Sequence, residues 1–318
     1  MAKFDRVYVG SAPWDSISTP IENLPDSATA SKAANLDWEV KTFPLTAKLP
    51  TGELQDVDRK RISYREDTMY ILGVVGEQFT PVNNLPAFKI VDDILALETG
   101  AKFDTAGSLD GGRRVYMTAR IQHDIKIPNT NDVVRSYVMI QNAHDGSGEL
   151  IARFVPMRLS NRTIMNAEVP GMRDFIGIRH TKFVESRIEE ATRVMKSAKN
   201  YFENLQQIFE QLALIPMTRS KMEEIVNKVV PIKDDAIKAT RTHSIREMIM
   251  QLYDSSTEGR DTGWAAYAAF CEYNDHYKGY KNTKKNTVAM YENRFLSILG
   301  GSTASIKNDA LYKILESK

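Results

Sequence analysis

The apolar residues of this chain change their spacing partway along the sequence. From Trp38 to Arg158 they occur in short runs rich in Val, Ile, Tyr and Phe, separated by polar turns, which is typical of β-strands. After Arg162 they recur every three to four residues, the spacing of amphipathic helices, and this pattern continues to the end of the chain. The sequence therefore predicts an α+β fold, with an N-terminal antiparallel β-sheet packed by a helix, followed by a mainly helical C-terminal half.

Turn and cap signals divide the two halves into elements. A helix opens after an Asn cap near Asn83 and is closed by Gly100. Two hairpins turn at Asp110-Gly111-Gly112 and at His144-Asp145-Gly146. The expected strands are residues 38–45, 61–66, 69–75, 101–109, 113–122, 133–143 and 149–159. The expected helices are 83–99, 182–214, 218–229, 244–253, 262–276 and 287–299.

Composition and local pattern suggest three parts. Residues 1–36 hold Pro13, Pro20 and Pro25 among Ser, Thr and Ala, with little periodicity, and are predicted to form an extended N-terminal arm. Residues 37–167 form the core of antiparallel sheet plus helix, and residues 168–318 form the helical region. A chain of 318 residues that is 42% hydrophobic and 26% charged has enough apolar surface for such a fold.

Charge and cysteine usage exclude several classes of function. With 42 Lys and Arg against 41 Asp and Glu, no global positive field exists, so nucleic-acid binding requires a local basic cluster. The single cysteine, Cys271, excludes an intrachain disulfide and a cysteine metal site. No phosphate-loop, nucleophile-elbow or histidine metal motif is present, so neither a cofactor nor a metal is expected. Without an apolar leader or a spanning segment, we expect a cytoplasmic protein with no membrane partner.

The turn at His144-Asp145-Gly146 allows two interpretations. His144 and Asp145 have the side chains of an acid/base pair, which would make this turn the centre of a hydrolase or a nucleotide-modifying enzyme. Alternatively, Asp145-Gly146 forms the hairpin turn and His144 caps it. A catalytic or metal site requires further convergent ligands, and their positions cannot be assigned from the spacing. The structural interpretation is the simpler one.

Arginines provide the stronger signal. Arg59, Lys60, Arg61 and Arg65 flank one predicted strand, while Arg113, Arg114 and Arg120 lie on another. If these strands are neighbours, their guanidinium groups line a groove that follows a phosphate backbone; otherwise they are ordinary charges on an exposed sheet. Arg158, Asn161 and Arg162 cluster beside an expected helix start, where free N–H groups favour anions. The candidate nucleic-acid-binding residues are Arg61, Arg65, Arg113, Arg114, Arg158, Asn161 and Arg162.

Six segments resemble, in order, those of the phage/plasmid-like proteins, known as domain of unknown function 932. They are LGVVGEQFTPVNN (72–84), AGSLDGGRRVYMTARI (106–121), NAHDGSGE (142–149), VPMRLSNRTIMNA (155–167), IRHT (178–181) and TGWAAYAAFCEYNDHY (262–277). The chain departs from the usual pattern at Ser160, where relatives tend to have a cysteine, and at Arg162, which lies between Asn161 and Thr163. The departure excludes a catalytic cysteine at that place.

The order of strands, helix, further strands and helical tail is similar, more distantly, to phage single-strand annealing proteins of the Red-beta/RecT type. That resemblance implies a non-enzymatic protein that binds and anneals single-stranded DNA during homologous recombination, as a homo-oligomeric ring or filament. A phage nuclease or a single-strand binding protein would be a further partner. The alternative is a non-enzymatic phage interaction protein, such as an inhibitor of host defence, that binds a protein partner.

Overall fold

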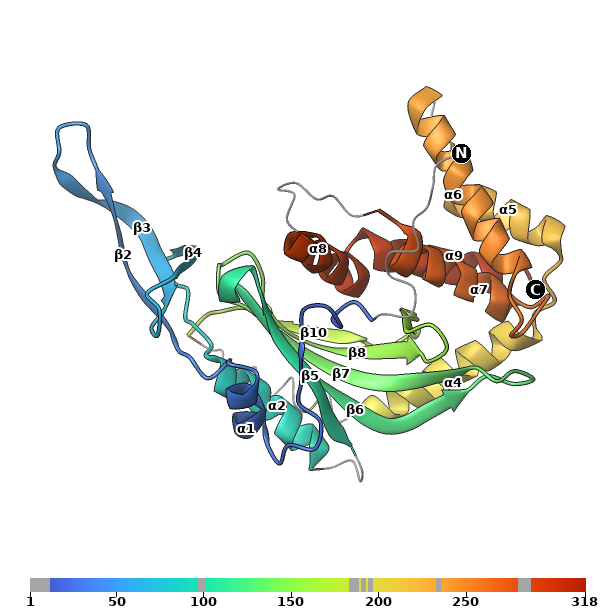
Figure 1. The fold of residues 1–318 in the computed structure, drawn as a ribbon, viewed down its shortest axis with the longest axis horizontal. Helices are drawn as coiled ribbons and strands as arrows, with labels where there is room; N and C mark the ends of the chain where they lie inside the picture. Colours follow the sequence, from blue (N-terminus) through green and yellow to red (C-terminus); the bar gives the residue numbers. More distant parts are fainter. Residues whose placement is uncertain are drawn as a thin grey trace.

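The computed structural model confirms the α+β class (Figure 1). It describes residues 12–96, 101–182, 189, 193, 197–232, 236–279 and 287–318. The strands are β1 (Thr19–Pro20), β2 (Val40–Lys48), β3 (Leu54–Arg65), β4 (Ile71–Gly76), β5 (Lys102–Leu109), β6 (Arg114–Lys126), β7 (Val133–Ala143), β8 (Leu150–Arg158), β9 (Thr163–Ile164) and β10 (Phe175–Ile178). The helices are α1 (Ser27–Ala33), α2 (Asn84–Leu95), α4 (Ala198–Leu214), α5 (Arg219–Val229), α6 (Ala236–Asp254), α7 (Gly263–Glu272), α8 (Thr287–Gly300) and α9 (Ser302–Leu315). No helix in these ranges is both long and apolar enough to cross a membrane.

The strands form two sheets. The main sheet has the order β1-β5-β6-β7-β8-β10, with β9 also paired to β8, and β2, β3 and β4 form a separate antiparallel sheet. We call this second sheet, residues 40–76, the finger, because it projects from the body of the molecule (Figure 1). Residues 54–60 of β3 are exposed, whereas Ile62 and Ser63 are buried at its base. The sequence pattern identified β2 to β8, but it carries no information about which strands share a sheet.

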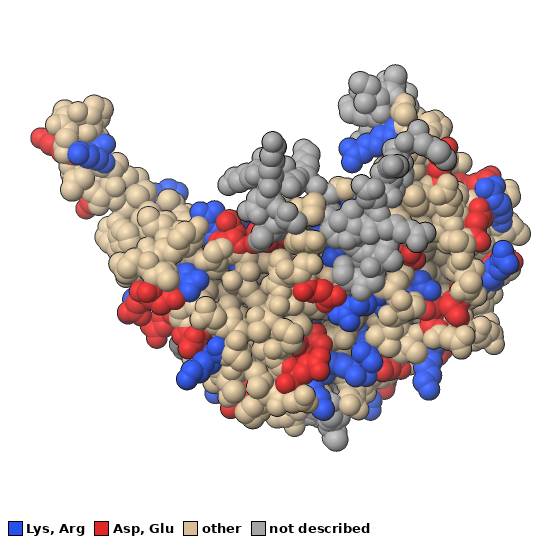
Figure 2. Space-filling model, in the orientation of Figure 1, with Lys and Arg blue, Asp and Glu red and all other residues tan. Residues whose placement is uncertain are grey.

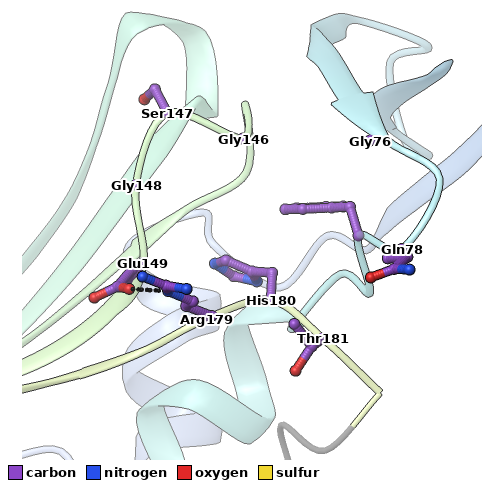
Figure 3. Close-up of a pocket in the computed structure, with 10 residues that line it drawn as sticks. Gly76, Gln78, Gly146, Ser147, Gly148, Glu149, Arg179, His180 and Thr181 are labelled. Atoms are coloured by element: carbon purple, nitrogen blue, oxygen red, sulfur yellow. Dashed lines mark hydrogen bonds and ion pairs between the residues drawn. The ribbon is translucent and has the colours of Figure 1, made fainter. Parts of the chain in front are cut away.

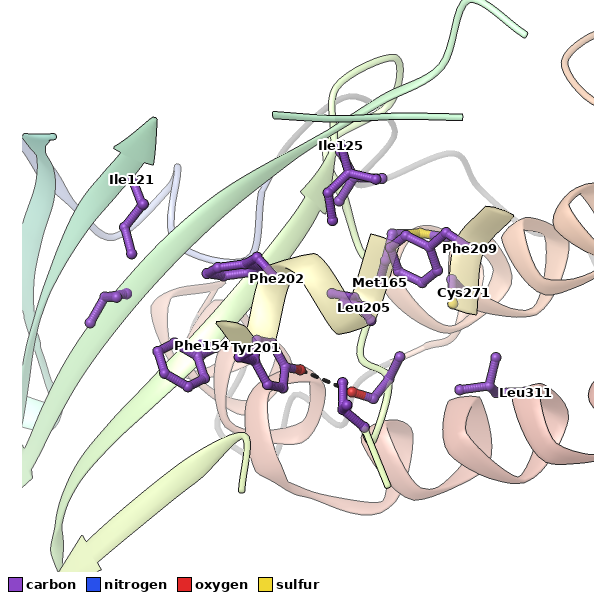
Figure 4. Close-up of a cluster of buried hydrophobic side chains, with 14 of the residues drawn as sticks. Ile121, Ile125, Phe154, Met165, Tyr201, Phe202, Leu205, Phe209, Cys271 and Leu311 are labelled. Carbon is purple, nitrogen blue, oxygen red and sulfur yellow. Dashed lines mark hydrogen bonds between the residues drawn. The ribbon is translucent and has the colours of Figure 1, made fainter. Parts of the chain in front are cut away.

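Helices cover both faces of the main sheet. On β8, Phe154 points to α4, where its ring lies 4.6 Å from that of Tyr201, and Val155 packs with Phe295 of α8 on the other face. Figure 4 shows α4 between the sheet and the C-terminal helices, with Phe202, Leu205 and Phe209 in the buried cluster. Because both faces of the sheet are covered, most residues of β7 and β8 are buried, and their sequences lack the strict alternation of apolar and polar residues.

The described part of the N-terminal arm, residues 12–36, packs on its own chain. β1 pairs with β5, and the Asp26 side chain caps α1, which packs on α2. Trp14 is completely buried, 6.1 Å from the ring of Tyr137. Buried apolar residues therefore fix a stretch whose prolines and lack of periodicity suggested an extended arm. Residues 1–11 lie outside the described residues, so contacts of the arm with other protomers stay a prediction.

The expectation of continuous helix after Arg162 was wrong. β9 and β10 follow first, and the helix expected from Lys182 is described only from Ala198 as α4. Residues 175–178 form a four-residue edge strand on β8, which is too short to give a periodic signal. Most of residues 183–196, and Gly100 as the expected end of α2, lie outside the described residues.

Candidate nucleic-acid interface at the base of the finger

Three polar segments meet where the finger joins the main sheet. They are residues 76–79 after β4, the turn 146–149 between β7 and β8, and residues 179–181 after β10. Each lies within one of the segments that carry the family resemblance. They enclose a cavity of about 410 Å³, which we call the joint cleft (Figure 3). Its lining residues are Gly76, Gln78, Phe79, Gly146, Ser147, Gly148, Glu149, Arg179, His180 and Thr181.

The turn beside the cleft is built as a hairpin turn. Asp145 Oδ1 accepts hydrogen bonds from the backbone N of Ser147 at 2.9 Å and from its Oγ at 2.6 Å. Gly146 has a φ of +76°, which glycine adopts without strain. Gly73 of β4 packs so closely on the turn that a Cβ there would lie 2.6 Å from the carbonyl oxygen of Asp145. The structural interpretation of Asp145-Gly146 is therefore confirmed.

His144 lies behind this turn in the protein interior. Its side chain is completely buried, with Nε2 2.8 Å from Asn84 Oδ1 and its ring 5.5 Å from that of Trp38. Burial, reinforced by neighbouring His180, lowers the pKa of His144 from 6.5 to about 3. A neutral, enclosed imidazole has no access to a substrate in the cleft, so the geometry does not favour an enzyme centred on His144.

His180 is the titratable ring that lines the cleft. It is 6% exposed and lies 4.9 Å from the Phe79 ring, with the two planes inclined by 30°. Burial lowers the pKa of His180, and both ring nitrogens are buried without a hydrogen-bond partner among the described residues. Arg179 pairs with Glu149 at 3.2 Å, as Figure 3 shows. The cleft thus has an aromatic wall made by Phe79 and the largely buried ring of His180, a feature that the sequence pattern did not indicate beyond the segment IRHT.

The described residues include no group of three or more His, Cys, Asp or Glu that is arranged to hold a metal ion.

The structure brings Arg65, Arg113 and Arg114 together where the 110–113 turn meets the base of the finger, and Arg114 extends from there to the rim of the cleft. The Arg65 guanidinium lies 4.3 Å above the Trp38 ring, binds Asp67 at 2.7 Å and donates to the Gly111 carbonyl oxygen. β3 and β6 both form but lie in different sheets, so the two strands that carry these arginines are not neighbours. The two groups of arginines meet only because the 110–113 turn touches the base of the finger.

Arg113 and Arg114 keep donor capacity on this surface. The Arg113 side chain is 39% exposed and pairs with Asp110 at 3.0 Å. Arg114 Nη2 donates to Ser147 Oγ at 2.6 Å, which places its guanidinium at the rim of the cleft. Each guanidinium carries five N–H groups, so one or two protein contacts leave others for phosphate oxygens.

The finger adds further cations beside the cleft. Lys60 of β3 pairs with Gly76, a lining residue, and Arg61 pairs with Val75. Arg61 donates to the side chain and carbonyl of Thr42 at 3.0 and 3.2 Å, so it lies flat on the finger. Acidic residues are interspersed, and Figure 2 shows mixed positive and negative side chains on the visible face. The basic character is local, as the near-zero net charge requires.

Arg158, Asn161 and Arg162 lie apart from this group. Arg158 is 7% exposed and its Nη2 lies 2.6 Å from Asp132, while Asn161 donates to Glu272 at 2.9 Å. Arg162 pairs with Asp15 at 2.8 Å. Carboxylates from three separate segments therefore occupy the donors expected to hold phosphate, and β9 follows where a helix start was predicted.

Comparison with known proteins gives one match. A family model described as Domain of unknown function (DUF932) matches residues 71–295, more than half of the chain, and includes every residue that lines the joint cleft. No curated protein and no solved structure matches the chain.

Proposed function

The chain belongs to the family Domain of unknown function (DUF932), a description that names no activity, and we propose that it binds and anneals single-stranded DNA. The observation that carries the proposal is that Arg114, which follows the partly exposed Arg113, contacts Ser147 at the rim of a cleft lined by Phe79 and His180. Single-strand binding proteins combine cations that follow the backbone with aromatic rings on which bases stack. The joint cleft supplies both within one surface.

In this proposal Arg113 and Arg114 bind successive phosphates of one strand. Tyr70, which is 45% exposed and lies against Gly111, provides a ring beside these arginines, and Phe79 with His180 provides a second. Arg61 and Arg65 support the interface from the finger, whereas Arg158 and Asn161 stabilise the protein away from it and Arg162 forms a partly exposed ion pair with Asp15. Annealing then needs no bond making, because a strand held by its backbone can pair with its complement through exposed bases.

The biological setting is part of the same proposal. We place the protein in phage homologous recombination, in the cytoplasm of the host cell, as a Red-beta/RecT-like protein that acts as a homo-oligomeric ring or filament. A partner nuclease or single-strand binding protein would supply or receive the strand. This placement rests on the distant resemblance in the order of strands and helices that the sequence suggests, which is an analogy of fold.

An exposed apolar surface favours the second candidate, a non-enzymatic phage protein that binds a protein partner. On the outer face of the finger, Phe43 and Val74 flank Ile62 and are 42% and 52% exposed. Ile71, opposite Tyr64, is 52% exposed. Contiguous apolar side chains on a projecting sheet are typical of protein interaction sites, and near-zero net charge is compatible with that role.

The two candidates are separated by a double charge reversal. We expect Arg113→Glu with Arg114→Glu to weaken binding of labelled single strands of any sequence. The logarithm of the binding constant falls linearly with the logarithm of the salt concentration, and the loss of two phosphate contacts should reduce the magnitude of that slope by roughly 1.4. Binding is measured by fluorescence anisotropy at several salt concentrations, and annealing by the rate of pairing with a complementary strand.

The control is Arg219→Glu with Arg260→Glu, which makes the same change of charge at the first residue of α5 and in the connection from α6 to α7. These helices lie on the side of the molecule away from the finger (Figure 1). This variant should bind as the parent protein does. A parent protein that stays monomeric in solution and neither binds the oligonucleotide nor accelerates pairing would refute the annealing proposal. Equal loss in both double variants would show nonspecific attraction without a defined interface.

A further inference from the structure

Arg153 is a buried cation with no close ion pair among the described residues, and Asp174 is the carboxylate whose charge acts on it. β8 directs Phe154 toward α4, so Arg153 points to the other face of the sheet, beside α8 and α9. It is 8% exposed, its Nε is buried without a hydrogen bond, and no ion pair involves it among the described residues. Leaving a guanidinium desolvated and unpaired is costly, which indicates that another group completes its environment.

The Arg153 side chain lines a cavity of about 640 Å³ between the sheet edge and α9, which we call the α9 groove. Gly300 allows the guanidinium to enter, because a Cβ there would lie 3.1 Å from Arg153 Nη2. The groove also has aromatic walls. Phe175, whose ring lies 5.5 Å from the Arg153 guanidinium carbon, is 45% exposed, and Tyr312 of α9 is 38% exposed.

The charges of the groove discriminate between ligands. Beside the single cation are three carboxylates, those of Glu168, Asp174 and Asp309. Glu168 is already held by Asn308 at 3.0 Å and Tyr312 at 3.2 Å, whereas Asp174 is half-buried and burial raises its pKa. A phosphate dianion would be repelled by these carboxylates. The arrangement favours a neutral planar ligand that accepts from Arg153 and donates to Asp174.

We propose that the α9 groove binds a guanine ring. The adjacent O6 and N7 of guanine accept both branches of a guanidinium, the pairing by which arginine selects guanine in nucleic acids. Its N1–H and amino group donate to a carboxylate, the role of Asp174, and the ring stacks on Phe175 or Tyr312. The ring can come from a free nucleotide or from an unpaired dG within a single strand. This groove is distinct from the joint cleft and does not depend on the annealing proposal.

Titration of the full chain with GMP, AMP, CMP and UMP tests the proposal, because the four share one phosphate and differ in the base. Calorimetry should detect GMP binding at least tenfold tighter than the others, and inorganic phosphate should not compete. Loss of one paired contact should weaken GMP binding roughly ten- to a hundredfold in Arg153→Met and in Asp174→Asn. Phe175→Leu, at an exposed site, tests the stacking without altering a buried charge.

Two further measurements identify where the guanine ring comes from and provide a control. Oligothymidine with a single dG should bind more tightly than oligothymidine alone if the base comes from a strand, and equally if the ligand is a free nucleotide. The Arg113→Glu, Arg114→Glu protein should bind GMP normally. Equal affinity for all four nucleotides, competition by phosphate, or unchanged GMP binding in folded Arg153→Met and Phe175→Leu proteins would overturn the proposal. In the last case Arg153 would serve only as a cation at the C-terminus of α8.

Discussion

Asp132 is the centre of the polar cluster that the sequence suggested as a phosphate site. It is 2% exposed and accepts hydrogen bonds from Arg158 Nε at 2.9 Å, Trp264 Nε1 at 2.9 Å and Ser160 Oγ at 3.0 Å. Asp132→Ala removes the close partner of the buried Arg158 charge and leaves only Glu272 at 4.0 Å, so we expect a loss of about 3 kcal/mol in the free energy of unfolding. Urea denaturation measures it.

The matched control is Arg162→Ala, which breaks the ion pair with Asp15 in a partly exposed place. That pair should contribute about 0–1 kcal/mol to the free energy of unfolding. If Asp132→Ala costs no more than this control, the cluster does not stabilise the junction as the geometry indicates.

His144 should make stability depend on pH. Its pKa is about 3 in the folded chain against 6.5 when exposed, so below pH 6.5 the unfolded chain binds the proton that the folded chain rejects. The full contribution of buried, neutral His144 to the free energy of unfolding is therefore present above about pH 6.5. It is lost as the pH falls toward 3, by at most about 1.4 kcal/mol per pH unit.

The test compares the parent protein with His144→Gln, whose amide can still donate to Asn84, between pH 7 and pH 4. The stability advantage of the parent should shrink as the pH falls. Buried Asp104 and Asp174, whose pKa values are raised by burial, act equally in both proteins and cancel. A stability difference between the parent and His144→Gln that stays constant from pH 7 to pH 4 would contradict the prediction.

At the scale of the element, the outer half of the finger contributes little to stability. Its residues are mostly exposed, including Leu54 at 74%, and Thr46 pairs directly with Asp56. Replacing residues 47–55 by Asn-Gly, a turn that suits a two-residue hairpin, should change the free energy of unfolding by less than about 1 kcal/mol. Thermal denaturation followed by circular dichroism measures this change.

The base of the finger should behave differently. Ile62 is 7% exposed, and Ile62→Ala should cost about 2 kcal/mol, the low end for a buried isoleucine, because its neighbours Phe43 and Val74 are half-exposed. A shortened finger that unfolds as readily as Ile62→Ala would show that the tip has contacts that its exposure does not indicate. If the shortened protein folds but loses a partner or its oligomeric state, the finger is the interaction element.

At the scale of the whole molecule, the hydrophobic core crosses the boundary that the sequence suggested at residue 167. One cluster contains Phe154 of the sheet, Phe202 of α4 and Trp264 of α7. The buried ion pair between Lys307 and Asp275, at 2.5 Å, joins α9 to the segment after α7, and Lys307 also donates to the Ile164 carbonyl oxygen. The sheet and the tail should therefore unfold together.

This predicts that a fragment ending at residue 167 lacks fixed tertiary structure, because removing α4 exposes one face of the main sheet. Near-ultraviolet circular dichroism should show little signal from the fragment, and a dye that binds apolar surface should bind to it. The full chain should unfold in one transition by calorimetry. A well-folded fragment, or two separate transitions, would show that residues 37–167 form an independent domain; until then the three-part division stays a prediction.

The sequence predicted the elements better than the site. Runs of Val, Ile and Tyr with polar turns between them identified β2 to β8, and helical spacing after Asn83 identified α2, because these signals are local. The site depends on contacts between distant segments. Arg65 and Arg114 were both candidates, yet only the packing of the finger on the 110–113 turn brings them to one surface, while Arg158 is directed to Asp132 in the interior.

The sequence by itself therefore determined the class of fold, the hairpin turn at Asp145-Gly146 and the absence of a strong overall charge, since each follows from residue type and short-range spacing. The tertiary structure decided which strands share a sheet, which arginines face solvent and which are neutralised by carboxylates far away in the chain. It also placed His180 in the joint cleft and Arg153 in the α9 groove. These outcomes depend on burial and on distant partners, and a linear pattern records neither.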